Sequence, residues 1–143
     1  MNVDAILRDK GDNVATVAPG ATIAEAVAVL HRERVGALVV SRDGVKVDGI
    51  ISERDVIQGL ARQGGRLMET RVDELMTRRV FTCSPNDGVA ELMAEMTGRR
   101  IRHIPVMRDG ALAGIVSIGD VVKTRLDEME YETSSLRSFN VGG

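Results

Sequence analysis

The sequence consists of two copies of one pattern, and this internal repeat limits the folds open to the chain. Residues of the first copy recur 66 positions later as far as an Asp-Gly pair, and 65 positions later beyond it. Because the matches keep their order, they indicate a tandem duplication. The matched residues are Val14, Thr16, Pro19, Ala24, Asp43, Gly44, Gly49, Ser52 and Asp55, paired with Val80, Thr82, Pro85, Ala90, Asp109, Gly110, Gly114, Ser117 and Asp120.

Each copy predicts the element order β-α-β-β-α, so the expected fold class is α/β (α+β) with two such repeats. The first helix of each copy carries apolar residues at i, i+3, i+4 and i+7, which gives one buried face. An Asp-Gly pair between two apolar runs is a strong hairpin signal. The expected strands are 14–17, 35–40 and 47–51 in the first copy and 80–83, 101–107 and 112–116 in the second, and the second helices begin at Ser52 and Ser117.

The repeat divides the chain into three parts. A first repeat with its lead-in is expected at 1–66, a second repeat at 67–128 and a C-terminal tail at 129–143. The boundary between the repeats follows the Gln63-Gly64-Gly65 stretch, where two glycines interrupt the helical pattern. A charged helix over about 118–130 precedes the polar end of the chain, which we expect to be mobile.

Composition excludes several classes of protein. Aromatic residues make up only 2% of the chain, whereas single-strand nucleic-acid binding uses aromatic rings on which bases stack. The formal net charge of −2 lacks the basic excess of a DNA-binding domain. No apolar run approaches the ~18 residues of a membrane helix, and no leader pattern opens the sequence. We therefore expect a cytoplasmic protein that binds neither membranes nor, in the main, nucleic acid.

The sequence offers little for catalysis or metal binding. Its one cysteine, Cys83, and two histidines fall short of a structural zinc site, and Cys83 is expected to be a small buried residue. We find no nucleophile spaced with a base and an orienting acid, and no Gly-rich phosphate loop of the Walker type. The chain is therefore expected not to be an enzyme and to require no metal.

The junction between the last strand and the last helix of each repeat carries the most specific motif. It reads Gly49-Ile-Ile-Ser52-Glu-Arg-Asp55 in the first copy and Gly114-Ile-Val-Ser117-Ile-Gly-Asp120 in the second. With these motifs the chain resembles a tandem pair of cystathionine-β-synthase (CBS) domains, a Bateman module, over about Asp4–Arg125. The resemblance implies two repeats packed with pseudo-twofold symmetry, here as a stand-alone module without a fused catalytic or transport domain.

The Ser-x-x-Asp part of the motif has two compatible interpretations. Serine at an N-cap and an acidic residue at N3 form a capping box, which stabilises a helix by about 1 kcal/mol. The same helix start also suits a phosphate, and a carboxylate one turn later can accept both hydroxyls of a ribose. The CBS resemblance implies the ligand role: Asp55 and Asp120 would hold ribose, and Ser52 and Ser117 phosphate or sugar.

The resemblance also implies the remaining walls of a nucleotide site. For hydrophobic residues such as Leu38 and Ile104, ordinary core packing is an equally good explanation. Basic residues suit phosphate because the arginine fork can bind two oxygens at once. Since the basic residues belong to the second copy, we expect the Asp120 site to bind an anionic nucleotide more tightly than the Asp55 site. The implied residues are Thr16, Val17, Ala37, Leu38, Thr82, Cys83, Ile104 and Pro105 near the base, and Arg102 and His103 near phosphate. A solvated helix end for Arg102 and an ordinary strand histidine for His103 are the alternatives. Arg54, next to Asp55, could also reach a phosphate across the cleft between the copies.

Three functions remain open at this stage. The first is a regulatory module that binds AMP or a related compound (ADP, ATP, NAD(H) or S-adenosylmethionine) between its repeats and signals energy or redox state to a separate partner. The second is a constitutive interaction module without a physiological ligand, in which the acidic stretch 127–132 and the tail form the contact surface. The third is nucleic-acid binding through the basic patch 99–102. The resemblance further implies a homodimer.

Overall fold

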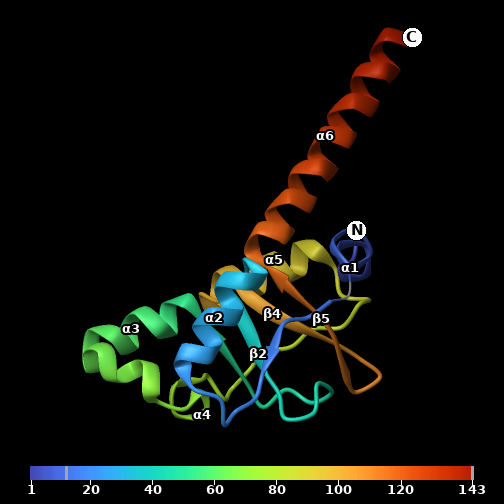
Figure 1. The fold of residues 1–143 in the computed structure, drawn as a ribbon. Coiled ribbons are helices and arrows are strands. Elements are labelled where there is room, and N and C mark those ends of the chain that lie inside the picture. Colours follow the sequence, from blue (N-terminus) through green and yellow to red (C-terminus); the bar gives the residue numbers. More distant parts are fainter. Residues whose placement is uncertain (12, 143) are drawn as a thin grey trace.

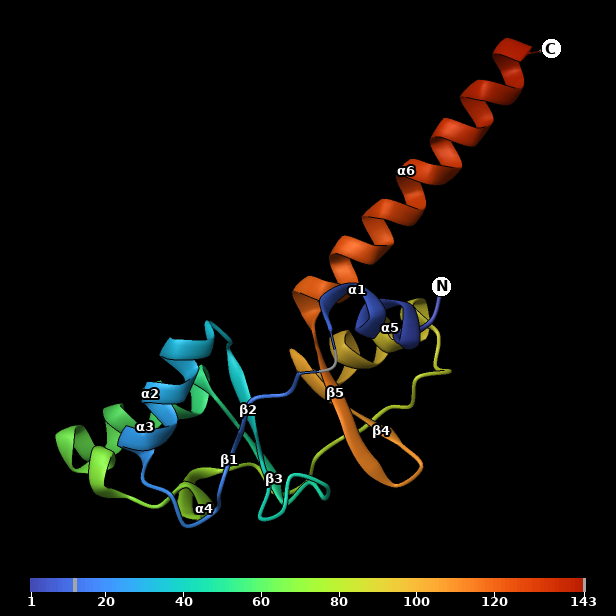
Figure 2. The ribbon, with the colours of Figure 1, turned by 45° about the vertical axis from the view of Figure 1, so that its right-hand side comes forward.

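The chain folds into two lobes, each built around a small sheet with helices against it (Figure 1). The computed structural model describes residues 1–11 and 13–142, with side chains as far as residue 133. Figure 2 shows the lobes side by side, with the last helix, α6, extending away from both of them. The lobes correspond to the two sequence repeats, and their mixed helices and strands confirm the expected α+β fold class.

The first lobe contains a three-stranded sheet in the order β1-β2-β3. β1 pairs with β2 in parallel, and β2 pairs with β3 in antiparallel register, with Leu38 opposite Ile51. Helix α2 begins at a capping box between Thr22 and Glu25, which confirms the sequence signal at this position. The elements of this lobe are β1 (Thr16–Val17), α2 (Ile23–Glu33), β2 (Ala37–Val40), β3 (Gly49–Ser52), α3 (Glu53–Gln63), η1 (Gly64–Glu69) and α4 (Val72–Leu75).

The second lobe contains the hairpin β4-β5 and three helices. The strand expected at 80–83 is reduced to a parallel bridge between Cys83 and Val106. Two backbone hydrogen bonds hold it, from the Cys83 N–H to the Pro105 carbonyl (3.0 Å) and from the Met107 N–H to the Cys83 carbonyl (2.8 Å). The elements of this lobe are α1 (Val3–Lys10), α5 (Val89–Arg99), β4 (His103–Arg108), β5 (Ala111–Ser117) and α6 (Ile118–Gly142).

The lead-in segments exchange lobes. Helix α1 precedes the first repeat in sequence, but its Val3, Ile6 and Leu7 lie in the core of the second lobe. Leu67 and Val72, which precede the second repeat, lie in the core of the first. Figure 2 shows α1 beside α5 and β5, and α4 below the first lobe. Each packing unit therefore combines residues from both sides of the sequence boundary that we expected near residue 66.

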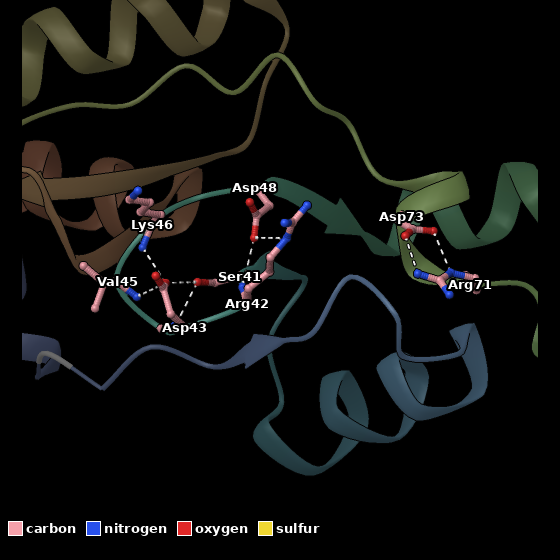
Figure 3. A network of polar contacts seen from close by, with 9 residues as sticks. Ser41, Arg42, Asp43, Val45, Lys46, Asp48, Arg71 and Asp73 are labelled. Carbon is pink, nitrogen blue, oxygen red and sulfur yellow. Dashed lines mark hydrogen bonds and ion pairs between the residues drawn. The ribbon is translucent and has the colours of Figure 1, made fainter.

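The two hairpins turn in different ways. In the second lobe, Asp109 and Gly110 join β4 to β5 directly, with φ of 52° and 79°, the positive pair that a type I′ turn requires. In the first lobe, Asp43 and Gly44 lie within a longer loop (Figure 3). There the Asp43 carboxylate accepts hydrogen bonds from the N–H groups of Lys46 and Val45, both at 2.9 Å, which lower its pKa. The Asp-Gly signal is thus confirmed as a hairpin twice, but as a two-residue turn once.

The last helix is longer than the sequence predicted. α6 runs over Ile118–Gly142, whereas we expected a helix ending near residue 130 and a polar tail after it. The backbone of that segment is therefore helical as far as the structure describes it, and the mobility expected of 129–143 stays a prediction. Exposed apolar side chains lie along the first turns of α6: Val122, Leu126 and Met129 are 37%, 54% and 56% exposed.

Candidate functional site: the cleft between the repeats

A pocket of about 710 Å³ opens where the two lobes meet. The first lobe contributes the start of α3, including Ser52 and Asp55, and the second lobe contributes the start of β4 with Arg102 and His103. The segment that links the lobes forms a further wall. The pocket is lined by Gly36, Ile50, Ser52, Glu53, Arg54, Asp55, Ile57, Gln58, Thr77, Arg79, Val80, Phe81, Arg100, Ile101, Arg102 and His103.

Ser52 and Asp55 form the capping box that the motif predicts. The Asp55 Oδ2 atom accepts hydrogen bonds from the Ser52 N–H (2.8 Å) and hydroxyl (3.0 Å), and the Asp55 N–H donates to the Ser52 Oγ (3.3 Å). Both bonds that the carboxylate accepts from Ser52 end on Oδ2, so Oδ1 lies outside the box. The cap therefore fixes the carboxylate at the pocket wall while one oxygen stays available to a hydroxyl donor.

The pocket is rich in cationic side chains. Arg54, Arg79, Arg100 and Arg102 line it, against the carboxylates of Glu53 and Asp55. Arg100 ends α5 in the left-handed conformation with φ of 55°, as Arg34 ends α2, which is a common way to terminate a helix. Such a set of guanidinium groups suits an anionic ligand, in particular one with phosphate oxygens.

His103 adds a titratable group to the same wall. Burial lowers the pKa of His103, and the opposing effect of the Glu53 carboxylate is smaller. The ring lies close to the backbone of the first lobe, because a Cβ placed on Gly36 would be 3.2 Å from the His103 Nε2 atom. The lowered pKa leaves the imidazole mainly neutral at neutral pH, so the arginines supply the positive charge of the pocket.

The structure brings together five of the residues predicted for the site: Ser52, Arg54, Asp55, Arg102 and His103. Leu38 and Ile104 are fully buried in the two lobe cores, as the packing explanation expected of them, and Val17 and Cys83 also belong to these cores. The predicted residues that do not line this pocket are Thr16, Val17, Ala37, Leu38, Thr82, Cys83, Ile104, Pro105, Ser117 and Asp120.

The basic residues of the second copy lie at a different motif from the one we expected. We expected the basic residues of the second copy to strengthen the Asp120 site, but Arg102 and His103 line the pocket that contains Asp55. The reason is the packing of the repeats: the residues around the start of β4 line the same pocket as the start of α3, so the first motif meets basic residues of the second repeat. Which of the two motifs binds an anionic nucleotide more tightly stays a prediction.

Several pocket residues escaped the sequence analysis. Thr77, Arg79 and Phe81 lie in the link between the lobes, and Arg100 caps α5. The repeat offset contained a signal for them, because Arg79 and Phe81 stand where the first copy has Asn13 and Ala15. A gain of charge or ring size in one copy marks positions where the two clefts differ in chemistry.

The glycine of each motif allows a close contact with the exchanged lead-in. A Cβ on Gly49 would lie 2.6 Å from the Met76 Sδ atom and 2.8 Å from the Thr77 carbonyl oxygen. On Gly114 it would lie 2.5 Å from the Leu7 Cδ2 atom. At Gly49 the backbone of the lead-in therefore crosses the final strand at a distance that only glycine permits, whereas at Gly114 the close atoms belong to the flexible Leu7 side chain.

The second motif has a different neighbour. Its capping box is also formed, with the Ser117 N–H donating to Asp120 Oδ2 (2.9 Å) and the Asp120 N–H donating to Ser117 Oγ (3.2 Å). The Lys10 ammonium, at the end of α1, donates to the same Asp120 Oδ2 at 2.7 Å. Burial raises the pKa of Asp120, but the hydrogen bonds from Lys10 and the Ser117 backbone outweigh it and lower the pKa overall.

The described residues bear on metal binding, thiol chemistry and membrane insertion. Within the part of the chain that was placed, no group of three or more His, Cys, Asp and Glu side chains could hold a metal ion. Burial raises the pKa of the Cys83 thiol to about 12, and Asp87 adds to the rise, so this thiol is not an activated nucleophile. Among the helices described, none is long and apolar enough to cross a membrane.

Two similar α+β repeats with a cationic, carboxylate-containing pocket between them define a module built from a duplicated domain. The family model described as CBS domain matches the chain twice, at residues 6–62 and 72–127. The chain therefore belongs to the CBS-domain family, as a tandem pair.

Known proteins resemble the chain over most of its length. A crystal structure of a CBS-domain-containing protein from Agrobacterium tumefaciens is 46% identical, covers 87% of this chain and 99% of its own, and superposes with a TM-score of 0.83. The mitochondrial CBS domain-containing protein CBSX3 of Arabidopsis thaliana is 39% identical over 126 residues. That match covers 85% of this chain but 61% of the Arabidopsis protein, so the chain spans less than two thirds of this relative.

Two similar structures contain ligands. A CBS domain protein from Pyrobaculum aerophilum, complexed with AMP, is 25% identical, covers 84% of this chain and 89% of its own, and has a TM-score of 0.74. The CBS domain pair of protein MJ0100, in complex with 5-methylthioadenosine and S-adenosyl-L-methionine, is 25% identical, covers 90% and 98%, and has a TM-score of 0.79. Both ligand sets contain adenosine.

Proposed function

We propose that the chain is a regulatory module that binds an adenine nucleotide in the pocket between its repeats. The observation that carries the proposal is the pairing, in one pocket, of the Ser52–Asp55 capping box with Arg79, Arg100 and Arg102. A ribose needs a hydrogen-bond acceptor, and a phosphate needs cationic donors, and the pocket offers both. The AMP complex of the Pyrobaculum protein supports an adenine nucleotide as the ligand.

The pocket suggests an orientation for the nucleotide. Asp55 accepts the ribose hydroxyls, and Arg102 and His103 lie on the phosphate side. Ile50, Val80, Phe81 and Ile101 offer apolar surface to the base. The Phe81 ring also contacts Arg99, whose guanidinium carbon lies 4.3 Å from the ring centroid.

The charge of the pocket favours phosphorylated ligands over S-adenosylmethionine. Four arginines line the pocket against two carboxylates. S-adenosylmethionine carries a sulfonium cation, which these arginines repel, whereas AMP, ADP, ATP and NAD(H) carry the phosphate oxygens that they bind. We therefore expect AMP to bind more tightly than S-adenosylmethionine.

The proposed ligand contacts both lobes and can therefore regulate. A nucleotide that bridges α3 and β4 stabilises one arrangement of the lobes, and a separate partner protein that prefers this arrangement responds to it. Catalysis is not part of the proposal, and the cytoplasmic location stays a prediction.

We further propose a homodimer, supported by exposed apolar side chains on the second helix of each repeat: Ile57 and Leu60 on α3, and Val122, Leu126 and Met129 on α6.

Calorimetric titration with AMP tests the proposal. The wild-type chain is expected to bind AMP, and Asp55→Asn is expected to weaken binding at least 10-fold while keeping the fold. The matched control is Asp127→Asn, which removes an exposed carboxylate on α6. Equal affinities in the two variants would contradict the assignment of Asp55.

The exposed apolar residues also favour the second function, a constitutive interaction module. Its signature is partner binding or self-association that stays the same with and without AMP. Nucleic-acid binding through 99–102 would instead show affinity for RNA or DNA that falls steeply with salt.

A further inference from the structure

Lys10 lies at the second Ser-x-x-Asp motif, the repeat counterpart of the motif in the proposed nucleotide pocket. Its ammonium bonds the Asp120 carboxylate at 2.7 Å and the Ile115 carbonyl oxygen at 2.9 Å. The Lys10 side chain is 33% exposed and that of Asp120 is 25% exposed, so the ion pair is partly withdrawn from solvent. Asp120 is the repeat counterpart of Asp55, the proposed ribose acceptor.

The contact with Ile115 shows what Lys10 replaces. In the first lobe, the carbonyl of Ile50, the counterpart of Ile115, accepts a hydrogen bond from the Thr77 N–H at 2.9 Å. There the lead-in helix α4 ends at Leu75, and the chain then runs along β3. Helix α1 instead continues to Lys10, which brings a side chain to the equivalent carbonyl and to the adjacent carboxylate.

The two clefts also differ in the residues at the phosphate side. With the offset of 66 residues, Arg102 and His103 of the pocket correspond to Gly36 and Ala37, and Arg100 corresponds to Arg34. The first repeat therefore has no charged residue at the counterparts of Arg102 and His103, whereas Lys10 lies at the Asp120 carboxylate.

We propose that Lys10 limits the chain to one adenine-nucleotide site, at Asp55, because its ammonium forms an ion pair with the Asp120 carboxylate. This inference rests on the proposed function of the Asp55 pocket. The Lys10 ammonium offsets the charge of the Asp120 carboxylate, which makes this carboxylate a weaker acceptor for ribose hydroxyls than that of Asp55. Methionine cannot form this ion pair, so Lys10→Met removes the cation and keeps a side chain of similar length.

The stoichiometry of AMP binding tests the inference. Equilibrium dialysis with radiolabelled AMP is expected to give one AMP per wild-type chain and two, the second weaker, for Lys10→Met. In the Asp55→Asn background the expected numbers are none and one. Arg8→Met, on the same helix and with its side chain 80% exposed, is the matched control and is expected to leave one site.

The outcomes separate this inference from the proposed function. Two equivalent sites in the wild type, or a single site in Lys10→Met, would overturn the role of Lys10 and leave the Asp55 pocket in place. No binding to the wild type would overturn both. Circular dichroism checks the fold of each variant, and Lys10→Gln serves as a second substitution if Lys10→Met does not fold, while the wild-type count stands independently of either.

Discussion

The Nζ atom of Lys10 lies 2.7 Å from Oδ2 of Asp120, across 110 residues of sequence. Asp55, at the same place in the first repeat, accepts hydrogen bonds from Ser52 at the wall of a cationic pocket. The two copies of the motif therefore differ in their surroundings. The Asp55 carboxylate lies in a pocket lined by arginines, and the Asp120 carboxylate forms an ion pair with Lys10.

Replacing Gly49 by alanine is expected to destabilise the fold by about 1–3 kcal/mol, the usual cost of overpacking. The added methyl group would meet the Thr77 carbonyl, a backbone atom that cannot rotate away. Urea unfolding followed by circular dichroism measures the change. Gly65→Ala is the control, since no atom lies within 4 Å of its would-be Cβ. Equal stability of the two variants would show that the lead-in does not pack tightly on β3.

Arg102→Gln is expected to weaken AMP binding by roughly 10-fold or more, since a hydrogen bond to a charged group contributes about 1.5–3 kcal/mol. Arg62→Gln, an exposed arginine at the far end of α3, should leave the affinity unchanged. Calorimetric titration gives both values. If both substitutions weaken binding equally, general charge rather than the pocket attracts the nucleotide.

His103 is expected to make stability fall at acidic pH. Its pKa is lower in the folded chain than the ordinary 6.5, so below about pH 6.5 the unfolded state binds more protons and stability decreases as pH falls. The charged groups around it are Glu53, Lys10, Asp120 and Arg102. Urea unfolding at pH 7.5 and 5.5 should show a smaller loss in His103→Gln than in the wild type. His31→Gln, on exposed helix surface, should keep the wild-type loss.

Cys83 is expected to resist alkylation in the native state. With a pKa of about 12, raised by burial, the thiol is protonated at pH 8 and is also shielded by the second core. Iodoacetamide labelling followed by mass spectrometry should be slow at pH 8 and rapid after denaturation. Fast labelling of the folded chain would mean that this core opens readily.

The sequence predicted the repeat, the element order and the Ser52–Asp55 and Ser117–Asp120 boxes, because each depends on local pattern and spacing. It did not predict that α1 packs into the second lobe, since apolar periodicity shows that a helix has a buried face and not which core receives it. For the same reason, the sequence analysis assigned Arg102 to the Asp120 site, whereas Arg102 lines the pocket that contains Asp55. Which motif it faces depends on how the repeats pack, and the repeat pattern carries no information about that.

The length of the first hairpin loop shows a further limit. Asp43-Gly44 and Asp109-Gly110 are identical in sequence, yet only the second pair forms the two-residue turn. In the first lobe, Ser41 and Asp48 add hydrogen bonds to the loop, with Asp48 Oδ2 accepting from the Arg42 N–H at 2.9 Å (Figure 3). Side-chain bonds to the backbone thus compete with the hairpin turn that the dipeptide favours.

Thermal unfolding with and without AMP, in the wild type and in Asp55→Asn, tests the central claim most directly. A ligand at about 100 times its dissociation constant adds roughly 2.7 kcal/mol, enough to raise the midpoint by several degrees. We expect AMP to raise the unfolding midpoint of the wild type and to leave that of Asp55→Asn unchanged. An equal rise in both proteins, or none in the wild type, would contradict nucleotide binding at the Asp55 pocket.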